Sequence, residues 1–271
     1  METSAPITCA RKTAREPVAL LSLVAAFIFI ATTAYTIYCT HSMSGGMEMP
    51  GGWVMSMMWM PMSGQSQAGA AFMFINMWVA MMVAMMLPSA MPMILIYRRV
   101  TAFRGAPDVA LRTWLMASGY FAVWALFGGI VYVFGLLLMK AAMNWTALSR
   151  AIPAASAVCL IASGIYQATP WKRACLKHCQ DPLSSVANHL HSGRLGALQM
   201  GLHHGALCAA CCWSLMLIQV VLGMMNLLVM AAIALVIALE KMMAQGTAVA
   251  KVVGAIAIVA GCAMLIRSIH G

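Results

Sequence analysis

The stretch Arg194–Met216, RLGALQMGLHHGALCAACCWSLM, is apolar enough for a membrane-spanning helix, yet it contains two adjacent histidines and three cysteines. Side chains three or four positions apart share one face of an α-helix. His203 lies about 100° around the helix from its neighbour His204. One helical stripe therefore contains His204, Cys208, Cys211 and Cys212.

These side chains have two explanations. A single cysteine behaves as a small hydrophobic residue, which would account for any one of the three by itself. Polar side chains at membrane depth are costly, however, and usually mark a functional site. For the whole set we therefore predict metal ligation by the stripe, with His203 as a further candidate: His203, His204, Cys208, Cys211 and Cys212.

Composition places the whole chain in a membrane. Of the 271 residues, 63% are hydrophobic and 8% are charged, and the mean hydropathy is +0.89. A soluble domain carries about 25% charged residues. The net charge of +10 comes from Lys and Arg in short loops, so no polar domain is left to bind nucleic acid. We predict a polar tail over residues 1–17 and a single transmembrane bundle over 18–271.

Apolar runs predict an all-α bundle of about seven transmembrane helices, because several of them approach the roughly 20 residues that a bilayer requires. The N-terminal run is longer than the apolar core of a signal peptide and lacks an A-x-A cleavage site, so we expect it to be retained. Pro88 and Pro92 should kink the second helix. The expected helices are about Val18–Tyr38, Ala68–Tyr97, Thr113–Met139, Ala151–Thr169, Leu198–Val221, Met225–Leu239 and Ala248–Ile266.

The basic residues predict the orientation of this bundle. With the N-terminus in the cytoplasm, 13 Lys and Arg residues fall on the inner side and 3 on the outer side, which agrees with the positive-inside rule. This orientation places a Met-rich loop, residues 41–67, outside the membrane. It places a polar loop rich in Cys and His, residues 170–197, in the cytoplasm.

The inner loop contains a second set of soft ligands, Cys175 and Cys179, four positions apart. Both can reach one ion if the segment is helical. The C-x3-C spacing is a weaker indication of zinc than paired C-x2-C knuckles, and an amphipathic turn with buried thiols is the alternative. Lys172, Arg173 and Lys177 serve in this interpretation as topology markers that would also lower the pKa of a nearby thiol.

Methionine forms the third set: 16 of the 28 methionines lie between Met43 and Met93. Thioether and thiolate sulfur favours Cu(I), whereas carboxylates favour Mg or Ca. Met81, Met85 and Met86 lie on the expected second helix, where methionine is also a common core residue. The loop at 41–67 should have no core to fill, so we expect either metal capture or insertion into the membrane surface there.

Several chemistries have no residues to support them. The chain contains no Walker motif, no G-x-G-x-x-G and no H-E-x-x-H. Its acidic residues number only 6, and none lies well inside an expected span, so a carboxylate di-iron centre lacks ligands. No catalytic motif is recognised.

Two motifs in this order carry a family resemblance. The first runs from Trp78 through Met81 and Ala84-Met85-Met86-Leu87 to Pro88-Ser89, and the second contains His203-His204-Gly205, Cys208 and Cys211-Cys212-Trp213. Further matches include Cys175, Cys179 and Glu240-Lys241. The chain thus resembles a bacterial family of predicted metal-binding integral membrane proteins, a domain of unknown function, over roughly residues 70–265. The resemblance implies a membrane protein that binds metal. We expect this multi-pass protein to lie in the bacterial inner membrane.

Taken together, these patterns predict a membrane protein that binds a soft transition metal for transport, homeostasis or delivery, with Cu(I) as the favoured metal and zinc as the alternative. Besides the lipid bilayer and the metal, a metallochaperone or a membrane enzyme would be the partner. Two other functions stay open. The chain could be a subunit or assembly factor of a copper-dependent membrane enzyme, or a thiol-disulfide oxidoreductase that uses Cys175 and Cys179.

Overall fold

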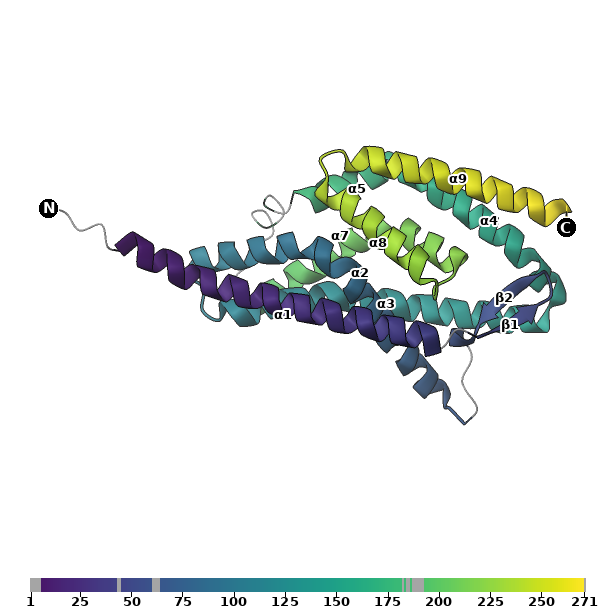
Figure 1. The fold of residues 1–271 in the computed structure, drawn as a ribbon, viewed down its shortest axis with the longest axis horizontal. Helices are drawn as coiled ribbons and strands as arrows, with labels where there is room; N and C mark the ends of the chain where they lie inside the picture. Colours follow the sequence, from purple (N-terminus) through teal and green to yellow (C-terminus); the bar gives the residue numbers. More distant parts are fainter. Residues whose placement is uncertain are drawn as a thin grey trace.

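The computed structural model describes residues 6–42, 45–59, 64–181, 183, 186 and 193–270. This part of the chain forms eight α-helices, a two-stranded hairpin and one 3-10 turn, η1 (Met57–Trp59) (Figure 1). The strands are β1 (Gly46–Met49) and β2 (Trp53–Ser56). The helices are α1 (Pro6–Ser42), α2 (Gln67–Phe103), α3 (Val109–Asn144), α4 (Thr146–Ala168), α5 (Pro170–Gln180), α7 (Gly193–Leu222), α8 (Leu227–Met242) and α9 (Gly246–His270).

The predicted all-α membrane architecture is confirmed. Six of the described helices, α1, α2, α3, α4, α7 and α9, are long and apolar enough to cross a bilayer. The seventh expected segment is α8, whose 16 residues extend about 24 Å at about 1.5 Å per residue. The remaining helix, α5, is short and amphipathic, and it lies in the stretch expected to be a loop.

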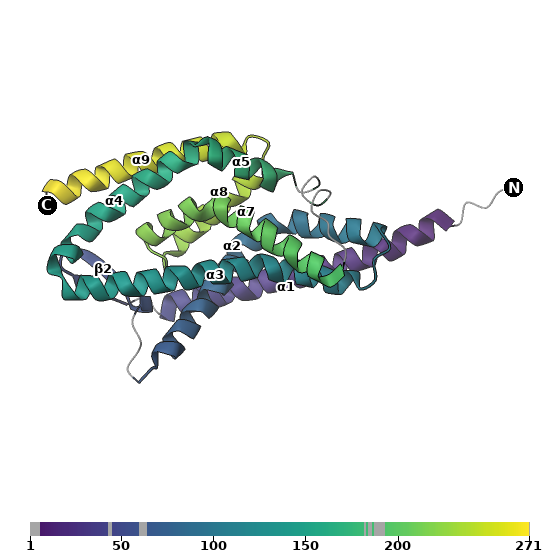
Figure 2. The same cartoon turned by 180° about the vertical axis from the view of Figure 1, so that it is seen from behind.

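The helices differ in how much of their apolar surface they bury. About half of the residues in the most apolar 18-residue segment of α2 and of α7 are buried inside the protein. In the corresponding segment of α1 only 6% are buried. These two helices therefore form the centre of the bundle, and α1 presents its apolar surface outward. Figures 1 and 2 show α2 changing direction along its length, as its internal prolines Pro88 and Pro92 predict.

The Met-rich stretch is not a loop throughout, because residues 46–56 form an antiparallel hairpin that pairs Gly46 with Ser56. Trp53 Nε1 donates a hydrogen bond to the carbonyl of Ser149, 3.0 Å away, and Ser149 Oγ donates to the carbonyl of Pro50 at 2.7 Å. The hairpin is thus fixed to the junction of α3 and α4. Residues 43–44 and 60–63 of this stretch lie outside the described residues.

The hairpin and α5 lie at opposite ends of α4 (Figure 1). The hairpin covers the turn between α3 and α4, and α5 packs against α7 and against the last turn of α8. The hairpin of the Met-rich stretch and the helix α5 of the Cys/His stretch are therefore separated by about the length of α4. Most of the segment that connects α5 to α7 lies outside the described residues.

Candidate metal centre

The stripe of soft ligands on α7 faces the interior of the bundle. His204 and all three cysteines of the helix, Cys208, Cys211 and Cys212, are buried. His203 is only partly buried, which follows from its position about 100° away from His204 around the helix. The structure therefore places the predicted stripe in the core and sets His203 to its side.

Cys208 has two polar neighbours that come from other helices. Lys241 Nζ, in the last turn of α8, donates a hydrogen bond to Cys208 Sγ at 2.8 Å. The hydroxyl of Tyr120, on α3, lies 3.0 Å from the same sulfur, and either group can donate this hydrogen bond. These two contacts hold the sulfur of Cys208 in place where α3, α7 and α8 meet.

The thiols of α7 continue as a line to α5. The side chain of Cys208 lies close enough to that of Cys212 to interact with it, and Cys211 interacts in the same way with Cys212 and Cys179. Cys179 belongs to α5, so a residue from the expected inner loop lies directly beside the helix stripe. We call Cys179, Cys211, Cys212 and Cys208 the thiol line.

A buried ion pair holds α5 in this position. Lys172 Nζ lies 2.7 Å from Glu240 Oε2 and donates to the carbonyl of Cys211 at 2.8 Å. Both side chains are essentially inaccessible to solvent, at 0% and 1% exposure. Gln180, at the other end of α5, donates to the carbonyls of Glu240 and Met243. Lys172 is therefore a structural residue that fixes Cys179 against α7, rather than only a topology marker.

The thiol line lies beside the C-terminal ends of α4 and α8. Tyr166, near the end of α4, donates from its hydroxyl to the carbonyl of Ala210 at 2.8 Å. Lys241, near the end of α8, reaches Cys208. The cysteines thus lie in the middle of α7 but at the ends of α4 and α8, where α5 covers them.

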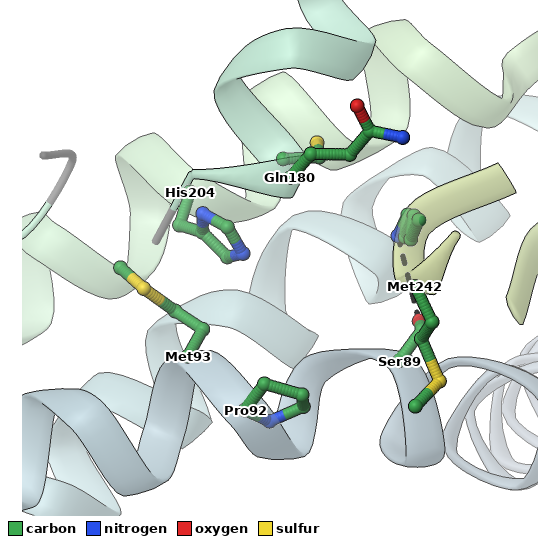
Figure 3. A pocket seen from close by; sticks show the side chains of 8 residues that line it. Ser89, Pro92, Met93, Gln180, His204 and Met242 are labelled. Atoms are coloured by element: carbon green, nitrogen blue, oxygen red, sulfur yellow. Dashed lines mark hydrogen bonds between the residues drawn. The ribbon is translucent and has the colours of Figure 1, made fainter. Parts of the chain in front are cut away.

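A pocket of about 210 Å³ lies beside this line. Figure 3 shows Met93 and Pro92 of α2, His204 of α7 and Gln180 of α5 around it. Cys179, Ser89, Lys241 and Met242 also line it. Met93, Cys179 and His204, which come from three different helices, therefore line one space.

The other predicted ligands lie apart from this pocket. Cys175 is partly buried one turn before Cys179, on the side of Tyr166. The α2 methionines Met81, Met85 and Met86 are buried in the main hydrophobic core. Gln219 Nε2 donates to Met81 Sδ at 3.6 Å. Core packing accounts for these methionines as well as metal binding does.

Within the described ranges, no group of three His, Cys, Asp or Glu side chains is arranged to hold a metal ion. The thiol line contributes its sulfurs as neighbouring pairs, and the pocket combines one cysteine and one histidine with methionine. Any metal bound here would therefore have few ligands, and those ligands would be mainly sulfur.

The expectation that the Met-rich stretch has no core to fill is wrong for the hairpin. Met49 and Met55 are buried against Ala142 of α3, and Met58 is buried in the main core. We predict that leucine at Met49 and Met55 leaves the affinity for added Cu(I) unchanged and changes the free energy of unfolding by less than about 1.5 kcal/mol, because Leu and Met have similar volumes. Copper analysis and denaturant titration of the double variant test this. A loss of copper would assign the hairpin to metal capture.

The sequence profile of a family described as "PpoB2: Copper chaperone" matches residues 75–264. The chain belongs to this family. No curated protein and no solved structure shows a significant match. The matched span contains the thiol line and every residue that lines the pocket, whereas α1 and the hairpin precede it. Membership of this family supports a copper-related function for the chain.

Sequence reasoning missed three residues of the centre: Tyr120, Met93 and Lys241. Lys241 was matched only as part of the Glu240-Lys241 pair of the resemblance, and counting it as a surface charge concealed its contact with Cys208. Met93 ends the methionine run of α2, and nothing in its spacing separates it from the core methionines. Contacts between distant helices, which no local pattern encodes, bring these residues to the site.

Proposed function

We propose that this protein holds Cu(I) on the thiol line and delivers it to a partner at the membrane. The observation that carries the proposal is the contact between Cys179 of α5 and Cys211 of α7, which joins two separate sets of cysteines into one series of sulfur ligands. The family description of a copper chaperone supports delivery over transport across the membrane.

The ligand chemistry favours Cu(I) over zinc. Thiolate and thioether sulfur selects Cu(I), whereas a structural zinc site requires four ligands in tetrahedral arrangement. The thiol line offers its sulfurs as neighbouring pairs, and Cu(I) accepts low coordination numbers. A bound ion can pass along the line by forming a bond to the next sulfur as it breaks the bond to the previous one, while it remains Cu(I) and the proton of the incoming thiol passes to the released thiolate.

We further propose the bacterial inner membrane as the location, with the N-terminus in the cytoplasm. Lys172 and Lys241 are held by specific contacts with Glu240 and Cys208 and should be removed from the charge count. Eleven basic residues then remain on the inner side against three on the outer side, so the positive-inside rule still favours this orientation. The thiol line would lie toward the cytoplasmic side, and the hairpin outside.

Cu(I) titration of the purified full-length protein tests the function. Serine at Cys208 and Cys212 should lower the Cu(I) affinity by more than about 100-fold, because these residues would be direct ligands and even indirect partners of a metal contribute about 10–100-fold. The affinity is measured under reducing conditions against a chromogenic Cu(I) chelator.

Serine at Cys159 and Cys262 is the matched control, because both residues are exposed on the outer helices α4 and α9. This variant should bind Cu(I) as the wild type does. Equal affinities of the wild type and the Cys208/Cys212 variant would overturn the proposal. A disulfide between Cys175 and Cys179 that titrates without copper would instead favour the thiol-disulfide oxidoreductase.

A further inference from the structure

The pocket beside the thiol line runs from an exposed rim to a buried interior. Met242, one of its lining residues, is 65% exposed. Met93 and His204, which also line it, are 2% and 5% exposed. The same space therefore joins the accessible surface to buried soft ligands. We propose that it is the exchange site of the protein, where Cu(I) enters or leaves on Cys179, His204 and Met93; this inference rests on the proposed function.

The donor set supports this assignment. Cysteine and methionine sulfur select Cu(I), and imidazole also binds copper. The three residues come from α5, α7 and α2 and line one space, into which the imidazole of His204 points (Figure 3). Among the many buried methionines, Met93 thus shares a pocket with both a thiol and an imidazole.

His204 supplies a second, independent observation. Its Nδ1 is buried and finds no hydrogen-bond partner among the described residues. Leaving a buried polar group unpaired costs about 1–3 kcal/mol, and most such groups in proteins are paired. An imidazole kept buried beside a pocket, with a ring nitrogen unpaired, is suited to receive a ligand.

The size of the pocket suits exchange between two proteins. A single water requires only about 10–15 Å³, so a volume of about 210 Å³ accommodates a copper ion together with a sulfur side chain from a partner. A partner ligand can therefore bind the ion before the pocket releases it. Cu(I) would be shared during transfer and would not pass through water.

Lys241 determines the route by which the ion passes from the pocket to the thiol line. Its ammonium lines the pocket and donates to Cys208 at 2.8 Å, with Ser89 Oγ 3.5 Å away. A positive charge therefore stands between the pocket and Cys208. Cys179 offers the alternative route, because its thiol lines the pocket and also contacts Cys211. The ion would pass from the pocket to Cys211 by way of Cys179.

Two measurements on the full-length protein test the exchange site. The first uses leucine at Met93 together with glutamine at His204. Transfer of Cu(I) to a chromogenic chelator in stopped flow should slow by at least about 10-fold, while the copper bound at equilibrium on Cys208 and Cys212 remains. The matched control is leucine at Met73 with glutamine at His178, both exposed and outside the pocket, which should transfer at the wild-type rate.

The second measurement is X-ray absorption of the Cys208→Ser/Cys212→Ser protein loaded with Cu(I). The ion left in the pocket should show both sulfur and nitrogen neighbours, and His204→Gln should remove the nitrogen. Met93→Leu alone should also slow the transfer of Cu(I). Leucine has about the same volume as methionine, so slow transfer in this single variant cannot be attributed to misfolding.

Wild-type transfer in the Met93/His204 variant, or copper without nitrogen neighbours, would overturn the exchange site. The proposed function would survive either result if serine at Cys208 and Cys212 still lowered the affinity. If that serine variant binds Cu(I) as the wild type does, the function fails, whatever the pocket variants do.

Discussion

Replacing Lys172 by methionine is expected to lower the free energy of unfolding by about 3–5 kcal/mol, because it leaves the buried carboxylate of Glu240 without a partner. Methionine at Glu240 should have a similar effect. With methionine at both positions most of the loss should be recovered, since replacing an entire buried pair by hydrophobic residues is often neutral. Denaturant titration in mixed micelles measures each variant.

An exposed ion pair in the same protein provides the control. Arg194 and Asp108 are 2.8 Å apart, with 64% and 51% of their side chains exposed. Arg194→Met should therefore cost less than about 1 kcal/mol. If the losses from Lys172→Met and Glu240→Met simply add in the double variant, the two residues do not act as a pair.

The charge of Lys172 is maintained under ordinary conditions. Burial opposes the charged form of Lys172. Electrostatic interactions with Cys212, Cys211 and Glu240 outweigh burial, however, and raise the pKa of Lys172 above its ordinary value. A raised lysine pKa adds stability that is present below the unfolded value of about 10.4 and is lost as the pH rises through the folded value. The contribution of Lys172 should therefore be constant across the neutral range.

The pair also connects stability to copper binding. Lys172 and Cys179 lie on the same short helix, α5, and Lys172 also bonds the backbone of Cys211. A variant that loosens α5 should thus separate Cys179 from the rest of the thiol line. Copper affinity should fall in Lys172→Met and recover in the double variant.

Local patterns in the sequence were sufficient to predict the helices and the placement of His204 and the three cysteines on one face of α7. The apolar runs give the spans because a bilayer requires about 20 apolar residues. The three- and four-residue spacing gives the stripe because it follows from helix geometry alone. His204 and the three cysteines of α7 are accordingly buried on one side of the helix, as predicted.

Contacts between distant segments could not be predicted in the same way. The hairpin depends on a hydrogen bond from Trp53 to Ser149, 96 positions away, and the thiol environment depends on Lys241. Glu240 and Lys241 appeared to be a polar end of a helix, because one-dimensional hydropathy does not show which neighbouring helix extends past that end. The partners of a buried charge are decided by tertiary packing, and the sequence alone does not contain that geometry.

A large packing effect is expected at Gly201, where α7 lies against α3. A Cβ built at Gly201 collides with the backbone carbonyl of Met116, and a backbone atom cannot move aside as a side chain can. Gly201→Ala should therefore cost about 3 kcal/mol, the upper part of the range for overpacked cores. The neighbouring contact at Gly205, where a Cβ would lie 2.9 Å from the carbonyl of Tyr120, leaves the helices little freedom to adjust.

This substitution should affect the metal centre as well as stability. Tyr120 contacts Cys208 across the same interface, so a displaced α3 removes one of the two polar neighbours of this thiol. Gly129→Ala is the matched control, because a Cβ at that position of α3 meets nothing within 4 Å; alanine there should be neutral or, by its helix propensity, stabilising by up to about 1 kcal/mol. Thermal unfolding measures the stability of both variants, and Cu(I) titration measures their affinity for the metal. If Gly201→Ala matches Gly129→Ala in both, close packing of α3 on α7 does not position Cys208.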